Sequence, residues 1–171
     1  MITIKDKFNI VGTEIPEFTL PNSRNQTRSI REFRGHSNVV IVLLRDIHWP
    51  YCRAHVGRLA LHYPEFQALN TDLLPILVDS IDNAKAMENK YAKNQFPIYY
   101  DPEKKVADLL HQEVRLIKLG RMPGLLVVDK NGIIQYAYYS EGMSDIPPNE
   151  AVFEILEQIE GKKREPITSE K

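Results

Sequence analysis

The chain has 171 residues, of which 43% are hydrophobic and 26% are charged, which suits one folded domain with a core of its own. Lys and Arg number 22 and Asp and Glu number 23, so the formal net charge is -1. This balance excludes the basic excess that is typical of nucleic-acid-binding proteins. No stretch approaches the ~18 apolar residues of a membrane span, and residues 1–10 contain no apolar segment of a signal peptide. We therefore expect neither nucleic acid nor a membrane as a partner.

The first part of the chain predicts a small hairpin followed by a buried strand. Ile15–Pro21 is β-prone and bounded by prolines, which is typical of an edge strand, and Thr27–Ile30 is expected to return beside it. Arg31–Gly35 predicts one helical turn that ends at glycine. Val39–Leu44 consists of consecutive apolar residues, mostly β-branched, and this indicates a strand that is buried on both faces.

The rest of the chain alternates between helical and strand patterns. Between Tyr51 and Asn70, apolar residues recur every three or four positions, as on one face of a helix. Pro64 lies inside this helix and predicts a kink or a break before it. Asn131-Gly132 between two apolar runs is a strong hairpin signal, because both residues tolerate positive φ. The remaining predicted strands are 73–78, 97–100, 125–129 and 133–139, and the remaining predicted helices are 84–93, 102–110 and 149–160.

This order of elements predicts an α/β fold. Strand–helix–strand units imply parallel pairing, whereas the Asn-Gly hairpin must be antiparallel. A mixed central sheet with helices on both faces and an N-terminal β-hairpin accommodates all of the elements. We expect a single domain over residues 1–161 and a flexible charged tail over 162–171.

The chain contains one cysteine, Cys52, and it stands where chemistry is expected. The buried strand ends near Leu44, a short loop follows, and the helix begins close to Pro50, which is favoured at the first helical position. Sites in α/β sheets form beyond the carboxyl ends of strands, and a helix N-terminus stabilises a thiolate. One cysteine cannot form an internal disulfide or a multi-thiolate zinc site, and no histidine pair has metal-ligand spacing. We therefore expect no metal, no cofactor and a reducing, cytoplasmic setting.

Several segments of the chain together carry a resemblance to known proteins. The turn Trp49-Pro50-Tyr51-Cys52-Arg53 is similar to the active-site turn of thioredoxin-fold redoxins, usually Cys-Pro-x-Cys-Arg. The other matching segments are Pro16–Pro21, Phe33-Arg34-Gly35, Met122-Pro123-Gly124 and Ser144–Glu150, so that the resemblance runs from about Gly12 to Ile159. Together these segments resemble the peroxiredoxin-like branch of the alkyl hydroperoxide reductase and thiol-specific antioxidant (AhpC/TSA) family, and the resemblance implies a thioredoxin-like fold.

The resemblance also implies an antioxidant oxidoreductase that reduces hydroperoxides. Cys52 would attack the peroxide, and an external thiol would regenerate it because no second cysteine exists. The family often keeps an arginine close to the thiolate, and Arg121 is our candidate for this catalytic role. Pro123 is expected to have the family's cis peptide bond. The predicted active-site loop comprises His48, Trp49, Pro50, Arg53 and Pro123.

One departure from the family's pattern keeps two functions open. Trp49 stands where the first cysteine of the turn falls, and Cys52 occupies the second, usually less exposed position. Cys52 is therefore either a reactive thiol or a small buried core residue. In the second case the chain is a catalytically degenerate redoxin that acts as a binding or assembly module. Edge strands such as Ile15–Pro21 leave a homodimer possible.

Overall fold

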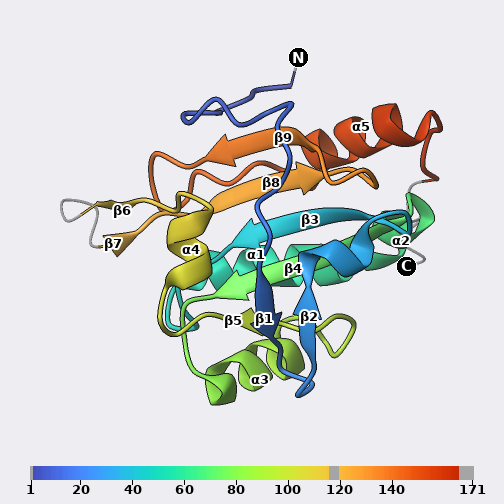
Figure 1. The fold of residues 1–171 in the computed structure, drawn as a ribbon. Coiled ribbons are helices and arrows are strands. Elements are labelled where there is room, and N and C mark those ends of the chain that lie inside the picture. Colours follow the sequence, from blue (N-terminus) through green and yellow to red (C-terminus); the bar gives the residue numbers. More distant parts are fainter. Residues whose placement is uncertain (1, 116–119, 166–171) are drawn as a thin grey trace.

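The computed structural model describes residues 2–115 and 120–165. Figure 1 shows the arrangement of its helices and strands. The elements in chain order are β1 (Thr19–Pro21), β2 (Thr27–Ser29), the 3-10 helix η1 (Ile30–Phe33), β3 (Asn38–Leu43), α1 (Pro50–Leu61), α2 (Tyr63–Ala68), β4 (Thr71–Leu77), α3 (Ile81–Lys90), β5 (Tyr99–Tyr100), α4 (Lys105–Leu109), β6 (Val114–Arg115), β7 (Gly120–Arg121), β8 (Gly124–Val128), β9 (Ile134–Tyr139) and α5 (Asn149–Glu160).

The predicted mixed sheet is confirmed. Its five strands have the order β5-β4-β3-β8-β9. β3 pairs parallel with β4, and β4 with β5, whereas β8 runs antiparallel to both of its neighbours, β3 and β9. β1 and β2 form the predicted N-terminal hairpin, and β6 and β7 form a second small antiparallel pair that the sequence patterns did not predict.

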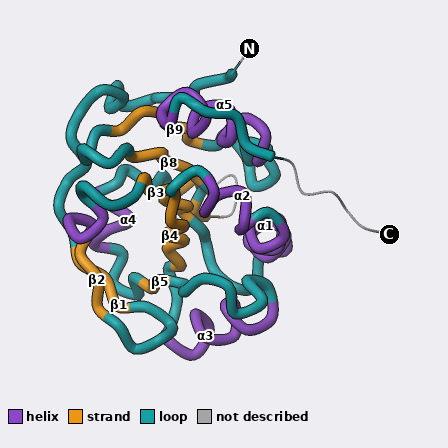
Figure 2. Tube along the Cα trace, turned by 90° about the vertical axis from the view of Figure 1, so that its right-hand side faces the viewer, coloured by secondary structure: helices purple, strands orange, loops and turns teal. Residues whose placement is uncertain are grey.

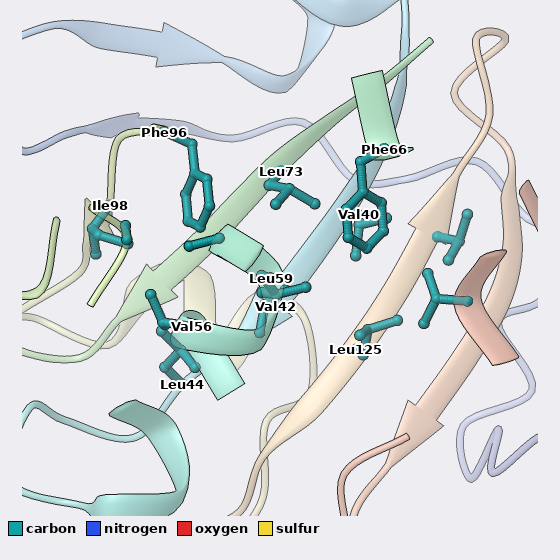
Figure 3. Close-up of a cluster of buried hydrophobic side chains, with 14 of the residues drawn as sticks. Val40, Val42, Leu44, Val56, Leu59, Phe66, Leu73, Phe96, Ile98 and Leu125 are labelled. Carbon is teal, nitrogen blue, oxygen red and sulfur yellow. The ribbon is translucent and has the colours of Figure 1, made fainter. Parts of the chain in front are cut away.

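Helices cover one face of the sheet, and shorter elements cover the other. Figure 2 shows α1, α3 and α5 on one side, and α4 with the β1–β2 hairpin on the opposite side. β3 is buried along its whole length because its side chains alternate between these two layers. Val40 and Val42 point into the layer of α1, together with Leu44, which follows the strand, and Figure 3 shows this cluster. Val39 and Ile41 point into the layer of the hairpin.

The break predicted at Pro64 is also confirmed. α1 ends at Leu61 and α2 begins at Tyr63, with the proline in the first turn of the second helix, where it is tolerated. α2 places Phe66 in the core, against the ring of Phe153 on α5 at 4.6 Å between centroids. This contact joins α2 to the C-terminal helix.

Both ends of the described chain are held on the fold. Residues 2–15 run beside β9, and Arg164 forms ion pairs with Glu65 and Glu150. The rest of the predicted tail, 166–171, lies outside the described residues. None of the described helices is both long enough and apolar enough to span a lipid bilayer.

Candidate active site

The turn between β3 and α1 is fixed by its own acidic side chain and by the neighbouring loop. The Asp46 carboxylate accepts a hydrogen bond from the backbone N–H of His48 at 2.8 Å. Asp79, which follows β4, accepts one from the backbone N–H of Ile47 at 3.2 Å. α1 then begins at Pro50, with Trp49 as its N-cap residue. These bonds hold the turn against the carboxyl ends of two parallel strands, where the sequence predicted a site.

Cys52 lies in the first turn of α1, but its side chain faces the core. The residue is 3% exposed and belongs to the cluster that Val42 and Val56 also form. The backbone N–H of Arg45 donates a hydrogen bond to Sγ at 3.3 Å. Burial raises the pKa of the Cys52 thiol above its ordinary value, although the backbone amides of Arg45 and Asp46 act in the opposite direction. While it is buried in this way, the sulfur is a neutral thiol at pH 7.

The side chains of Arg45 and Trp49 in the same turn stack on each other, and we call this pair of side chains the cover. The Arg45 guanidinium carbon lies 3.7 Å from the centroid of the indole ring, which is cation–π geometry. Gly120 on β7 permits this position, since a Cβ there would come within 2.9 Å of the guanidinium carbon and φ of the residue is +135°. The indole is half-buried and packs against the core cluster that contains Cys52. Trp49, which the sequence analysis placed at the position of the family's first cysteine, is thus a packed ring.

Arg121 lies on β7 and is 7% exposed. Its ion-pair partner is Asp108 on α4, at 3.8 Å from Nη1, and this nitrogen has no hydrogen-bond partner among the described residues. α4 covers the face of the sheet opposite α1, as Figure 2 shows. A contact between Arg121 and Cys52 stays a prediction.

The other predicted loop residues have separate positions. His48 and Pro50 are exposed. The guanidinium of Arg53 lies over the ring of Tyr91, which follows α3, at 5.8 Å. Within this turn, the structure stacks Arg45 on Trp49, and Trp49 packs against the core cluster that contains Cys52.

The expected cis peptide bond before Pro123 is wrong: the described residues contain no cis peptide bond. The trans form is favoured by about 0.5–1 kcal/mol for a bond before proline. The backbone groups on either side of this bond already have hydrogen-bond partners. Met122 donates its N–H to the carbonyl oxygen of Glu113 at 2.8 Å, and the Pro123 carbonyl accepts from Ser140 at 3.1 Å.

Two buried polar residues lie near the turn, of which Gln112 was not predicted from the sequence. Gln112 is 6% exposed, and its amide nitrogen donates to the carbonyl oxygens of Leu44 and Met122, each at 3.0 Å. It therefore ties the end of β3 to the segment before β8. His55, one helical turn after Cys52, is buried, and burial lowers its pKa to about 3. The imidazole is neutral at pH 7 and supplies no positive charge to the sulfur.

The surroundings of Cys52 predict how its reactivity depends on pH. We expect the rate of Cys52 alkylation by iodoacetamide to rise with pH through a midpoint above ~8.5, the value of an ordinary thiol. Because the folded chain holds the thiol proton more tightly than the unfolded chain, stability falls as pH rises from the unfolded pKa through the folded one. Alkylation rates measured from pH 6 to pH 11, in buffer and in denaturant, check this. A native midpoint at or below the unfolded one would contradict it.

Among the described residues, no group of three or more His, Cys, Asp or Glu side chains is arranged to hold a metal ion. A cavity of about 460 Å³ lies between residues 2–5, β9 and the start of α5, and none of the predicted site residues lines it. The β3–α1 turn itself holds one sulfur, the backbone amide that donates to it, and a guanidinium that stacks on the indole.

Known proteins share this arrangement of elements. The crystal structure of AhpC from Enterococcus faecalis superposes with a TM-score of 0.77 over 88% of this chain and 92% of that chain, at 17% identity. Peroxidoxin BcpB from Mycobacterium tuberculosis gives a TM-score of 0.73 over 88% of this chain and 96% of the other, at 16% identity. At this level of identity the likeness shows the fold, which is the predicted thioredoxin-like fold of peroxiredoxins.

Proteins that are similar in sequence are also peroxiredoxins and alkyl hydroperoxide reductases. A 1-Cys peroxiredoxin from Dictyostelium discoideum is 31% identical over 104 residues, which are 58% of this chain and 43% of the relative. Alkyl hydroperoxide reductase E from Mycobacterium tuberculosis is 27% identical over 132 residues, covering 74% of this chain and 83% of the relative. The chain spans less than two thirds of the Dictyostelium protein and of the rice peroxiredoxin Q, of which it covers 59%.

The family model of the AhpC/TSA family matches residues 11–137. This match runs from the residues before the N-terminal hairpin into β9 and includes the β3–α1 turn. Since it covers well over half of a chain that also has the family's fold, the chain belongs to the AhpC/TSA family.

Proposed function

We propose that the chain is a peroxiredoxin-like oxidoreductase that reduces hydroperoxides through Cys52, with an external thiol as reductant. One observation carries the proposal. The only sulfur of the chain that can act as a nucleophile lies in the first turn of α1 in a member of the AhpC/TSA family, with the Arg45 N–H donating to it. The single cysteine also supports a reducing, cytoplasmic setting.

The reaction begins when the Cys52 thiolate attacks the distal oxygen of the hydroperoxide. An S–O bond forms, the O–O bond breaks, and the departing alkoxide takes a proton to become an alcohol. Cys52 is then a sulfenic acid. A first external thiol condenses with it to a mixed disulfide and releases water, and a second thiol frees Cys52 and leaves as a disulfide with the first. The Arg45 guanidinium, whose charge lowers the pKa of the Cys52 thiol, is our candidate to stabilise the departing oxygen, and Arg121 is a second candidate for the same role.

The proposed reaction requires the cover, the stacked side chains of Arg45 and Trp49, to open. Burial is the largest influence on the Cys52 thiol and raises its pKa, whereas the amide and the charge of Arg45 both lower it. Because Trp49 packs against the cluster that contains Cys52, we infer that displacing the indole would admit water and peroxide to Sγ and reduce the desolvation, which would leave the influences that favour the thiolate. We therefore propose that the reactive state is one in which Trp49 has moved away from the core cluster.

A second candidate function is supported by a different observation. The sulfur is 3% exposed in a turn whose first cysteine position holds tryptophan. If the cover does not open, the chain is a catalytically degenerate redoxin that serves as a binding or assembly module, and Cys52 is a core residue.

Turnover separates the two functions. With hydrogen peroxide or tert-butyl hydroperoxide and excess dithiothreitol, we expect the chain to accelerate peroxide loss, and Cys52→Ser to reduce the rate to that of dithiothreitol alone. Tyr51→Ala is the matched control, because this neighbour in the same turn is 47% exposed and should leave the rate unchanged. Equal rates for the wild type and a folded Cys52→Ser variant would refute the proposed activity and favour the binding module.

A further inference from the structure

The peptide group that joins Leu44 to Arg45 lies at the start of the β3–α1 turn, and we call it the turn peptide. Before it, the N–H of Leu44 donates to the carbonyl oxygen of Ile76 at 2.9 Å. After it, the carbonyl oxygen of Arg45 accepts from the N–H of Val78 at 3.2 Å. The N–H of the turn peptide, which belongs to Arg45, donates to Sγ of Cys52 at 3.3 Å. Bonds to β4 and to the residue after it thus hold the chain on both sides of the turn peptide, whose own N–H serves the sulfur.

A side chain from another part of the chain binds the oxygen of the turn peptide. Gln112 follows α4, and its amide nitrogen donates to the carbonyl oxygens of Leu44 and Met122, each at 3.0 Å. A primary amide has two N–H donors, so one nitrogen can serve both oxygens. The carbonyl oxygen of Leu44 and the N–H of Arg45 belong to the same planar group. The bond from Gln112 therefore also fixes the direction in which that N–H points.

Gln112 is itself held in place by its neighbours. The residue is buried, and its backbone N–H donates to the carbonyl oxygen of Ala107 on α4 at 2.9 Å. The next residue, Glu113, accepts a hydrogen bond from the N–H of Met122 at 2.8 Å. Figure 1 shows α4 and the β6–β7 pair beside the end of β3. Contacts to α4 and to the segment before β8 thus fix the Gln112 amide where it meets the turn peptide.

We propose that Gln112 is a positioning residue for Cys52, which orients the turn peptide so that its N–H stabilises the thiolate. A hydrogen bond to the charged form of an acid lowers its pKa, and the amide of Arg45 acts on the Cys52 thiol in this direction. A bond accepted by the carbonyl oxygen also polarises the N–H of the same peptide group and strengthens it as a donor. The consequence for peroxide reduction rests on the proposed function, whereas the effect on the thiolate does not.

The test replaces Gln112 with methionine, which has a similar length and no N–H donor. Alkylation of Cys52 by iodoacetamide is measured from pH 6 to pH 11 in the full chain. We expect the midpoint of the profile to move to higher pH and the rate at pH 8 to fall about 3- to 10-fold, as for the loss of one hydrogen bond to a charged group. The rate on the high-pH plateau should equal that of the wild type. A change in the opening of the cover would instead alter the rate by the same factor at every pH.

Gln95→Met is the matched control. The amide nitrogen of Gln95 donates to the carbonyl oxygen of Ala60, near the other end of α1, at 2.8 Å. This substitution removes the same kind of bond and leaves the turn peptide untouched, so the midpoint should equal that of the wild type. Gln112→Ser is a second variant, in which water can solvate the two carbonyl oxygens if methionine is not tolerated. Its midpoint should move in the same direction as that of Gln112→Met.

The positioning role and the proposed function can fail separately. A folded Gln112 variant with the wild-type midpoint would overturn the positioning role, and so would an equal shift in Gln95→Met or an equal loss of rate at every pH. If the midpoint moves as expected but the wild type does not react with hydrogen peroxide, the positioning role stands and the proposed function fails. If Cys52 reacts with peroxide at pH 7 equally fast in the wild type and in Gln112→Met, the proposed function stands and the positioning role fails.

Discussion

Replacing Trp49 with alanine is expected to speed the reaction of Cys52 with peroxide and with small alkylating reagents by about 5- to 30-fold. The substitution removes the ring on which the Arg45 guanidinium stacks at 3.7 Å. A partly desolvated cation–π contact is worth about 1–2 kcal/mol, and this free energy corresponds to the stated factor in the population of the open turn. The measurement is the rate of Cys52 alkylation at fixed pH in the wild type and in the variant.

Tyr91→Ala provides the matched control for this prediction. It removes an aromatic ring from beneath Arg53, the other arginine of the same segment, whose guanidinium lies 5.8 Å from that ring. The rate at Cys52 should be unchanged in this control, since Arg53 does not stack on the indole. If Trp49→Ala reacts at the wild-type rate, or if Tyr91→Ala gains as much, the cover does not control access to the sulfur.

Phe66→Ala should produce a large loss of stability and leave the cover intact. Phe66 is fully buried on α2 and packs against Phe153 of α5. Truncation of a buried phenylalanine costs about 3–5 kcal/mol, and at ~2–4 °C per kcal/mol the melting temperature should fall by roughly 6–20 °C. Thermal unfolding followed by circular dichroism measures this.

Leu61→Ala is the control for the core substitution, because Leu61 is 68% exposed at the end of α1 and should change stability by no more than ~0.5 kcal/mol. Well below the melting temperature, Phe66→Ala should alkylate at Cys52 at the wild-type rate. A small loss of stability would contradict the packing role of Phe66, and a faster reaction of Cys52 at low temperature would show that α2 is coupled to the turn. Together with Trp49→Ala, this variant separates stability from access to the sulfur.

Local sequence patterns were sufficient to predict the elements whose structure is determined by residues next to one another in the chain. The apolar run before Leu44, the Asn-Gly hairpin between β8 and β9, and the break at Pro64 are each determined by neighbouring residues and were confirmed. α5 has the bounds of the predicted helix 149–160. α4 is shorter than the predicted helix 102–110, because its first turn begins only after Lys104, which has φ of +64°.

The features that the sequence patterns missed depend on contacts between distant residues. Residues 2–15 have no strand pattern of their own, and backbone hydrogen bonds hold them beside β9. Gln112 carries no motif, yet it bridges two strands that are far apart in the sequence. The burial of Cys52 could not be decided from the sequence, because its helical spacing placed it only near the apolar face. The stacking of Arg45 over Trp49 could not be predicted because it depends on Gly120, which lies on a distant strand. The family's pattern, moreover, implied a cis bond at Pro123 that this chain does not adopt.

Trapping of the oxidised sulfur tests most directly whether Cys52 receives the peroxide oxygen. The wild type and Trp49→Ala are each treated with one equivalent of hydrogen peroxide in the presence of dimedone, which captures sulfenic acid, and the peptide containing Cys52 is analysed by mass spectrometry. We expect the dimedone adduct on Cys52 in both proteins, formed faster in Trp49→Ala. An unmodified Cys52 thiol in both proteins, after an exposure that fully modifies a free cysteine peptide, would contradict peroxide reduction by this chain.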